Sequence, residues 1–197
     1  MVHWLWLASW VLINGVLIGC VPMSRTSTPS SINFFGEWQS LCFPSSKLDS
    51  SHMDQYKIED KNITWTKTGY RGANCTGEKV YQYRILMTYL EPSEPKSGLD
   101  QSKIDFTYGK SFFTPHSESG IEIGRDIDPS KTWVLNHELE FENSNFKVGK
   151  VDYDIMAVTA DSLCLGDRDD AHDKSNPENR PVLLSKICLA RVLPPQL

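Results

Sequence analysis

Several sequence patterns are missing from this chain of 197 residues, and each absence argues against a class of protein. After the apolar N-terminal run, no segment approaches the roughly 20 apolar residues that a membrane-spanning helix needs. The formal charge of −5 comes without a basic stripe, which argues against a nucleic-acid partner. No window has the periodicity of a convincing amphipathic helix, and we find no internal repeat.

Motifs for catalysis and metal binding are also missing. The sequence has no Cys-x-x-Cys, no Gly-x-Ser-x-Gly, no phosphate-binding loop and no His-Glu-x-x-His. His137 lies on the apolar face of a predicted strand, where a histidine is more often a hydrogen-bonded core or cavity residue than a catalyst. We therefore expect no enzyme, no catalytic residue, no cofactor and no metal site.

The N-terminus is an apolar run from Trp4 to Leu17, which is too short to span a bilayer and has the length of a signal-peptide core. It ends in Leu17-Ile18-Gly19-Cys20, although no Lys or Arg precedes Cys20. These four residues resemble a bacterial lipobox, in which the peptidase cuts before the cysteine and the thiol carries lipid. We expect a lipoprotein signal peptide at 1–19 and a flexible Ser/Thr/Pro-rich tether at 20–33. Plain secretion is the alternative.

The lipobox resemblance implies a location and a membrane partner. Cys20 would carry diacylglycerol, with palmitate as a further acyl chain, and this N-terminal lipid would hold the protein to a membrane. Val21 follows the cysteine, where an Asp would be expected to retain a Gram-negative lipoprotein in the inner membrane. The expected location is the bacterial cell envelope, at the outer membrane, facing the periplasm or the surface.

Alternation of apolar and polar residues dominates from residue 34 to residue 193. Val80–Tyr89, Lys103–Tyr108 and Trp133–Glu142 alternate strictly, which is typical of half-buried antiparallel strands. Shorter segments with strand character are Phe35–Cys42, Gln55–Glu59, Ile63–Lys67, Lys150–Val158, Ser162–Leu165 and Leu183–Val192. About eight to ten such strands predict an all-β domain, either an antiparallel up-and-down barrel or a sandwich.

Three short motifs favour the barrel. Gly36-Glu37-Trp38 begins the first predicted strand, Val151-Asp152-Tyr153 lies late in the chain, and Arg191 lies on the last strand. Their order resembles that of lipocalin-type (calycin) barrels, in which an Arg covers the Trp at the closed end. The resemblance implies a cation–π contact between Arg191 and Trp38, worth about 0.5–2 kcal/mol. The alternative is a core tryptophan and an unrelated surface cation.

Five cysteines leave one odd residue in a secreted chain. If Cys20 carries the lipid, the other four form an even set with three possible pairings. On the barrel scheme we favour Cys42–Cys75, which would tie the Trp38 strand to the start of the Tyr81–Tyr89 strand. The other bond would be Cys164–Cys188, which would tie the two closing strands. Each bond would stabilise the folded protein by about 3–4 kcal/mol, because it closes a loop in the unfolded chain.

Aromatic residues on the predicted strands suggest a function. They could line the interior of the barrel and hold a small hydrophobic ligand. These candidate lining residues are Tyr81, Tyr83, Tyr89, Phe106, Tyr108, Trp133 and Phe141. A structural or protein-interaction lipoprotein, whose interior is filled by the same side chains, is the alternative.

The acidic segment that begins at Asp167 has carboxylates at some positions of a calcium-binding loop. However, Ala171 and His172 occupy positions where that loop requires a ligand and a glycine. A solvated hairpin loop is therefore the interpretation that we favour.

Overall fold

The structure is a computed structural model that describes residues 34–45, 49–90 and 101–193. The predicted signal peptide (1–19), the predicted lipidation site Cys20 and the predicted tether (20–33) lie outside the described residues. The strands are β1 (Gly36–Gln39), β2 (Phe43–Ser45), β3 (Ser50–Glu59), β4 (Asn62–Arg71), β5 (Lys79–Leu90), β6 (Ser102–Pro115), β7 (Leu139–Phe141), β8 (Val151–Val158), β9 (Ser162–Leu165) and β10 (Leu189–Arg191). The helices are α1 (Glu118–Ile127) and the short 3-10 helix η1 (Pro177–Asn179).

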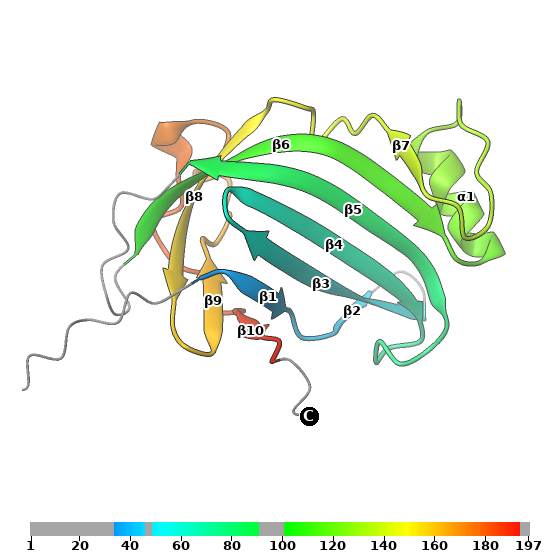
Figure 1. The fold of residues 1–197 in the computed structure, drawn as a ribbon, viewed down its shortest axis with the longest axis horizontal. Coiled ribbons are helices and arrows are strands. Elements are labelled where there is room, and N and C mark those ends of the chain that lie inside the picture. Colours follow the sequence, from blue (N-terminus) through cyan, green and yellow to red (C-terminus); the bar gives the residue numbers. More distant parts are fainter. Residues whose placement is uncertain (1–33, 46–48, 91–100, 194–197) are drawn as a thin grey trace, which may run out of the picture.

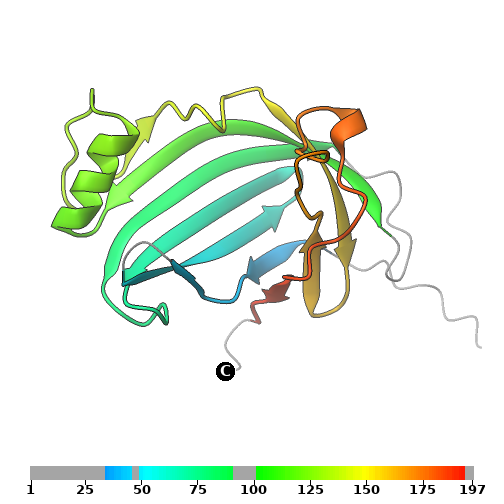
Figure 2. The ribbon, with the colours of Figure 1, turned by 180° about the vertical axis from the view of Figure 1, so that it is seen from behind.

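Eight of the strands close into an antiparallel barrel. Their order around the ring is β1, β10, β9, β8, β6, β5, β4 and β3, and β3 pairs back to β1. β2 adds to β3 and β7 adds to β6 outside this ring. The all-β, up-and-down barrel predicted from the alternation is therefore confirmed (Figures 1 and 2).

The barrel wall is uneven because its strands differ greatly in length. β3, β4, β5 and β6 have 10, 10, 12 and 14 residues, whereas β1, β9 and β10 have 4, 4 and 3. The predicted strands Gln55–Glu59 and Ile63–Lys67 are inner segments of β3 and β4. β6 pairs with β8 along its first half and with β7 along its second half. The long strands thus reach beyond the ring to α1 (Figure 1).

Trp38 and Arg191 close one end of the barrel, as the lipocalin resemblance implied. Trp38 is fully buried, and Arg191 lies opposite it in the β1–β10 pairing, with its guanidinium carbon 4.1 Å from the ring centre. Gly36 has φ +124°, and a Cβ there would lie 3.2 Å from the guanidinium Nη1 of Arg191. Glycine at this position therefore suits both the backbone and the space that the arginine takes up.

The main hydrophobic core fills the barrel from this closed end. It combines Trp38 with aliphatic and aromatic side chains from every long strand. Its buried members are Trp38, Ile58, Ile63, Ile85, Met87, Tyr89, Ile104, Phe106, Tyr108, Met156, Leu163 and Leu189. Among the described residues, no helix is long and apolar enough to cross a membrane.

The strand predicted at Trp133–Glu142 is wrong except for its last part. Only Leu139–Phe141 forms a strand, β7, and the residues before it form a loop. The loop turns at Asn136, which has φ +57° and donates its backbone N–H to the Pro115 carbonyl. His137, predicted on an apolar face, is exposed in this loop, because its segment does not pair with a neighbouring strand.

Helix α1 is an element that the sequence pattern did not predict. The Ser117 side chain caps it by accepting a hydrogen bond from the Gly120 N–H. A Cβ at Gly120 would lie 2.1 Å from the Val80 carbonyl oxygen, and one at Gly124 would lie 2.9 Å from the Trp133 ring. These two glycines allow close packing against β5 and Trp133. They also lower the intrinsic helix propensity of the segment, so its sequence does not predict a helix.

Candidate functional site

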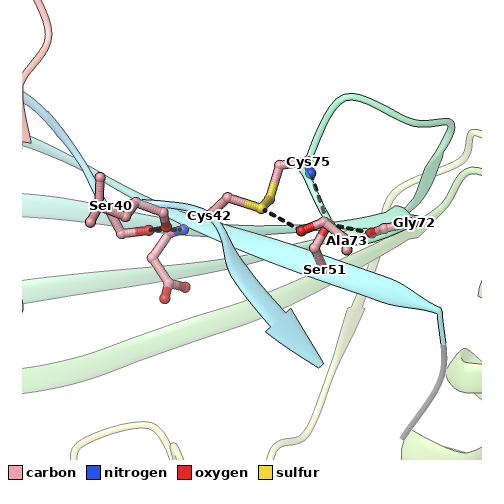
Figure 3. The surroundings of a disulfide bond; sticks show 8 residues. Ser40, Cys42, Ser51, Gly72, Ala73 and Cys75 are labelled. Carbon is pink, nitrogen blue, oxygen red and sulfur yellow. Dashed lines mark hydrogen bonds between the residues drawn. A yellow bond between two sulfur atoms is a disulfide. The ribbon is translucent and has the colours of Figure 1, made fainter. Parts of the chain in front are cut away.

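Two disulfide bonds each hold a loop segment to a neighbouring part of the barrel. Cys42, between β1 and β2, bonds to Cys75 in the β4–β5 loop, with Cα atoms 5.8 Å apart. The Ser51 hydroxyl accepts a hydrogen bond from the Cys75 N–H and donates one to the Gly72 carbonyl, which fixes this loop on β3 (Figure 3). Cys164 on β9 bonds to Cys188 just before β10, with Cα atoms 4.4 Å apart. Both bonds are the pairs that we favoured from the sequence.

The seven aromatic residues proposed to line the interior divide between two clusters. Tyr89, Phe106 and Tyr108 belong to the main core inside the barrel. Trp133 and Phe141 belong to a second cluster with Phe113 and Ile121, which we call the helix-side cluster. Tyr81 packs against the helix-side cluster, and Tyr83 contacts both. The proposed lining is therefore not one surface.

Three aromatic residues outside the proposed set lie together in the barrel. Tyr56 on β3 stacks on Trp65 on β4, with ring centres 6.0 Å apart and an interplanar angle of 12°. Phe146, from the loop between β7 and β8, lies 5.3 Å from the Trp65 ring and 5.0 Å from the Tyr108 ring. Alternation in Gln55–Glu59 and Ile63–Lys67 could have identified Tyr56 and Trp65. Phe146 has no such signal because it lies in a loop.

Two aspartates on β8 are buried in the barrel wall. Asp152 is 3% exposed and accepts a hydrogen bond of 2.7 Å from the Tyr108 hydroxyl. Asp154 is 2% exposed, and its Oδ2 lies 2.6 Å from the Lys174 ammonium nitrogen. Burial raises the pKa of Asp154, although the Lys174 charge opposes the shift. The Val151-Asp152-Tyr153 motif thus contributes a buried carboxylate, with a second two residues later.

The connection between β9 and β10, residues 166–188, binds to these carboxylates. Arg168 pairs with Asp152 at 3.1 Å and Lys174 pairs with Asp154. Arg180 pairs with Asp105 on β6 at 2.6 Å. The interpretation of this segment as a solvated hairpin loop is therefore incomplete, because three of its cations anchor it to β6 and β8.

The acidic residues of the same connection bond within it. Asp169 accepts hydrogen bonds from the backbone N–H groups of Ala171 and His172. Asp173 accepts from the Ser175 hydroxyl and the Asn179 amide, and these bonds lower its pKa to about 2. In the described part of the chain, no group of His, Cys, Asp and Glu side chains is arranged to hold a metal ion.

A cavity of about 210 Å³ lies between β3 and the strands β9 and β10, and we call it the β3–β9 cavity. Six of its ten lining residues are aliphatic or aromatic, and polar groups, with Asp54 and two serines among them, form a comparable part of the wall. Its lining residues are Ser40, Phe43, Asp54, Tyr56, Leu163, Leu165, Gly166, Ser185, Ile187 and Leu189. Its size and mixed lining fit a small molecule with an apolar body and one polar group.

A larger cavity of about 870 Å³ lies where β7 ends on β6 and the 143–148 loop begins. Lys110, Lys131 and Lys147 line it, and all three are exposed. Lys110 pairs with Glu140 on the same wall at 2.8 Å. These exposed charged side chains are well hydrated, and a hydrophobic molecule bound beside them would displace that water. The β3–β9 cavity, in contrast, lies against the buried core residues Leu163 and Leu189.

Tyr56 and Asp54 give the β3–β9 cavity its polar character. Trp65 donates its indole N–H to the Asp54 carboxylate at 3.0 Å. Among the described residues, that carboxylate has no ion-pair partner. Burial raises the pKa of Tyr56, and the charges of Asp54 and Asp154 raise it further, so its phenol stays protonated at neutral pH.

The barrel, with Trp38 beneath Arg191 at its closed end, is compatible with a calycin-like fold. In searches against protein-family models and against curated proteins, neither a family model nor a curated protein matches the chain.

Proposed function

We propose that this protein is a lipid-anchored envelope protein whose barrel binds a small hydrophobic ligand in the β3–β9 cavity. The observation that carries the proposal is the cavity itself, with Leu163, Leu165 and Leu189 on its wall. Its volume of about 210 Å³ is below the roughly 300–1,000 Å³ of most ligand sites. The proposed ligand is therefore small, and the proposed function is to bind it.

The proposed anchor is the acylated Cys20, after removal of residues 1–19. The two disulfides support this part of the proposal, because such bonds persist in oxidising compartments outside the cytoplasm. The described chain begins at Phe34, whose carbonyl accepts the Trp38 indole N–H at the closed end of the barrel. A tether from the membrane would thus reach the closed end, and the 166–188 connection would remain accessible from the envelope space.

A structural or protein-interaction lipoprotein is the second candidate, and one observation favours it. Phe146 packs on Trp65 and Tyr108, so aromatic side chains of the protein already occupy much of the interior. A barrel filled in this way needs no ligand for stability. The two candidates differ in whether the β3–β9 cavity takes up a molecule.

Native mass spectrometry of the protein from its own host can distinguish the candidates. The ligand-binding proposal predicts a stoichiometric small molecule on the wild type. It also predicts loss of that molecule from Leu165→Trp, because the larger side chain would fill the cavity that Leu165 lines. Leu183→Trp is the matched control, since Leu183 is 68% exposed and is not part of the lining. A wild-type protein that carries no molecule and excludes hydrophobic probes would support the interaction protein instead.

A further inference from the structure

We infer that the ligand of the β3–β9 cavity is a small organic cation, an amine with an apolar body, and that Asp54 binds its ammonium group. This inference rests on the proposed function and specifies the ligand class of the same site. It depends on the charges around the cavity, on the position of Asp54 beside Tyr56 and Trp65, and on the apolar side chains in the remaining wall.

The first argument is that Asp54 differs from the other carboxylates of the barrel interior. Asp152 is paired with Arg168 and Asp154 is paired with Lys174. Asp54 is half-buried, yet the only side-chain donor to its carboxylate in the described chain is the Trp65 indole. A carboxylate that is partly removed from water and lacks a cation is unfavourable, and a ligand ammonium would offset that cost.

The second argument concerns Lys67, the nearest candidate for an internal partner. Lys67 lies directly opposite Asp54 in the β3–β4 pairing. Its ammonium nitrogen lies over the Trp65 ring instead, 5.9 Å from the ring centre, and forms no ion pair with Asp54. The Asp54 carboxylate thus remains available on the side that faces the cavity.

The third argument is the chemistry of the wall beside Asp54. Tyr56 lines the cavity there, and an aromatic ring of this kind attracts organic cations. Phe43, Leu163 and Leu189 supply an apolar surface for the body of the ligand. A carboxylate, an aromatic ring and several aliphatic side chains are together complementary to an alkyl or aryl ammonium, and the carboxylate opposes the binding of an anion.

Three probes of matched shape test the inference: 2-phenylethylammonium, 2-phenylethanol and phenylacetate, titrated into the full-length protein at neutral pH by calorimetry. We expect 2-phenylethylammonium to bind at least about tenfold more tightly than the alcohol, and phenylacetate to bind most weakly. The Trp65 indole N–H signal in an NMR spectrum should shift with the amine, because this group donates to Asp54.

Asp54→Asn is the decisive variant, since it removes the charge and keeps an oxygen that can accept the Trp65 N–H. It should weaken binding of the amine by at least about tenfold and leave binding of the alcohol nearly unchanged. Asp49→Asn is the matched control, because Asp49 is exposed and the change in net charge is the same. Circular dichroism and thermal unfolding of both variants establish that they fold.

The possible results separate this inference from the proposed function. If the amine and the alcohol bind equally well, and Asp54→Asn changes neither affinity, the inference of a cationic ligand is wrong. The proposed ligand-binding function would remain. Preferential binding of phenylacetate would also overturn it and would indicate Lys67 as the charged partner. If the wild type binds none of the three probes, both the inference and the ligand-binding proposal fail for this cavity.

Discussion

Replacing Lys174 with Met should strongly destabilise the barrel, because it leaves the Asp154 carboxylate buried without its cation. The side chains of Lys174 and Asp154 are 13% and 3% exposed. After the change, the backbone N–H groups of Ile155 and Gly166 would still donate to Asp154. Removing one partner of a buried pair costs about 3–5 kcal/mol, whereas an exposed pair is worth about 0–1 kcal/mol. We expect a loss of about 3 kcal/mol in the free energy of unfolding at neutral pH.

The loss of unfolding free energy caused by Lys174→Met should also depend on pH. Burial raises the pKa of Asp154 in the folded protein, and Lys174 is the largest influence that opposes the rise. Without Lys174 the folded pKa rises further, while the unfolded value stays at about 3.9. A carboxyl group whose pKa is higher in the folded than in the unfolded protein stabilises the fold at pH values below the unfolded pKa. This contribution to the free energy of unfolding is lost as the pH rises through the folded pKa. The penalty of Lys174→Met should therefore grow between about pH 4 and pH 7.

Urea unfolding followed by circular dichroism, at both ends of this pH range, measures the effect. Lys186→Met is the matched control, because Lys186 is exposed on the same connection and forms no ion pair among the described residues. In the double variant Asp154→Asn/Lys174→Met, the growth of the penalty with pH should disappear, since the titrating carboxyl group is gone. A penalty for Lys174→Met below about 1 kcal/mol, or one equal at both pH values, would show that solvent screens the pair and would refute this reasoning.

Three further predictions concern the closed end, a disulfide and the anchor. Gly36→Ala should lower the free energy of unfolding, measured in urea, by about 1–3 kcal/mol, because Gly36 has φ +124° and lies next to the Arg191 guanidinium. Gly149→Ala is the control and should cost less, because Gly149 has φ +82° and nothing lies near its added Cβ. Equal losses for the two variants would exclude a role for Arg191. Replacing Cys164 and Cys188 with Ser should cost about 3 kcal/mol in the same assay, and unchanged stability would contradict this. Cys20→Ser should leave an uncleaved or soluble product in cell fractionation, and a correctly cleaved variant that still sediments with membranes would refute the lipobox interpretation.

The parts of the fold that the sequence predicted well are those with a local signal. β5 and β6 each have one face in the core, so apolar and polar residues alternate along them. The contact between Trp38 and Arg191 could be anticipated because the Gly36–Trp38 motif and the late position of Arg191 resemble those of lipocalin-type barrels. The disulfide pairs followed from the order of the strands once a barrel was assumed.

The predictions from the sequence fail where tertiary contacts override the local pattern of apolar and polar residues. Trp133 and Phe141 are both buried in the helix-side cluster, so the segment between them alternates like a strand although most of it is a loop. Alternation also shows which residues share a face, but not which end of a long strand they occupy. For this reason alternation places the aromatic residues of β5 on one lining, whereas in the structure Tyr81 packs toward α1 and Tyr89 lies in the main core.

The cation partners of the β6 and β8 carboxylates could not be found from the sequence, because they lie far along the chain. Lys174 is 20 residues from Asp154, and Arg180 is 75 residues from Asp105. No periodicity links such positions, and composition alone makes the connection look like an ordinary acidic loop. That Asp54 has no ion-pair partner among the described residues was equally unpredictable, since it depends on where the Lys67 side chain points.

The 166–188 connection links the stability of the barrel to the candidate site. Ser185 and Ile187 line the β3–β9 cavity, and the neighbouring Cys188 holds this part of the chain to β9. The same connection is anchored at Lys174 by Asp154, which also accepts the N–H of Gly166 in the cavity wall. A ligand that contacts Ile187 and Gly166 would bind best when the connection is held against β8. By linkage, that ligand must in turn stabilise the docked connection, so Lys174→Met should weaken binding as well as folding.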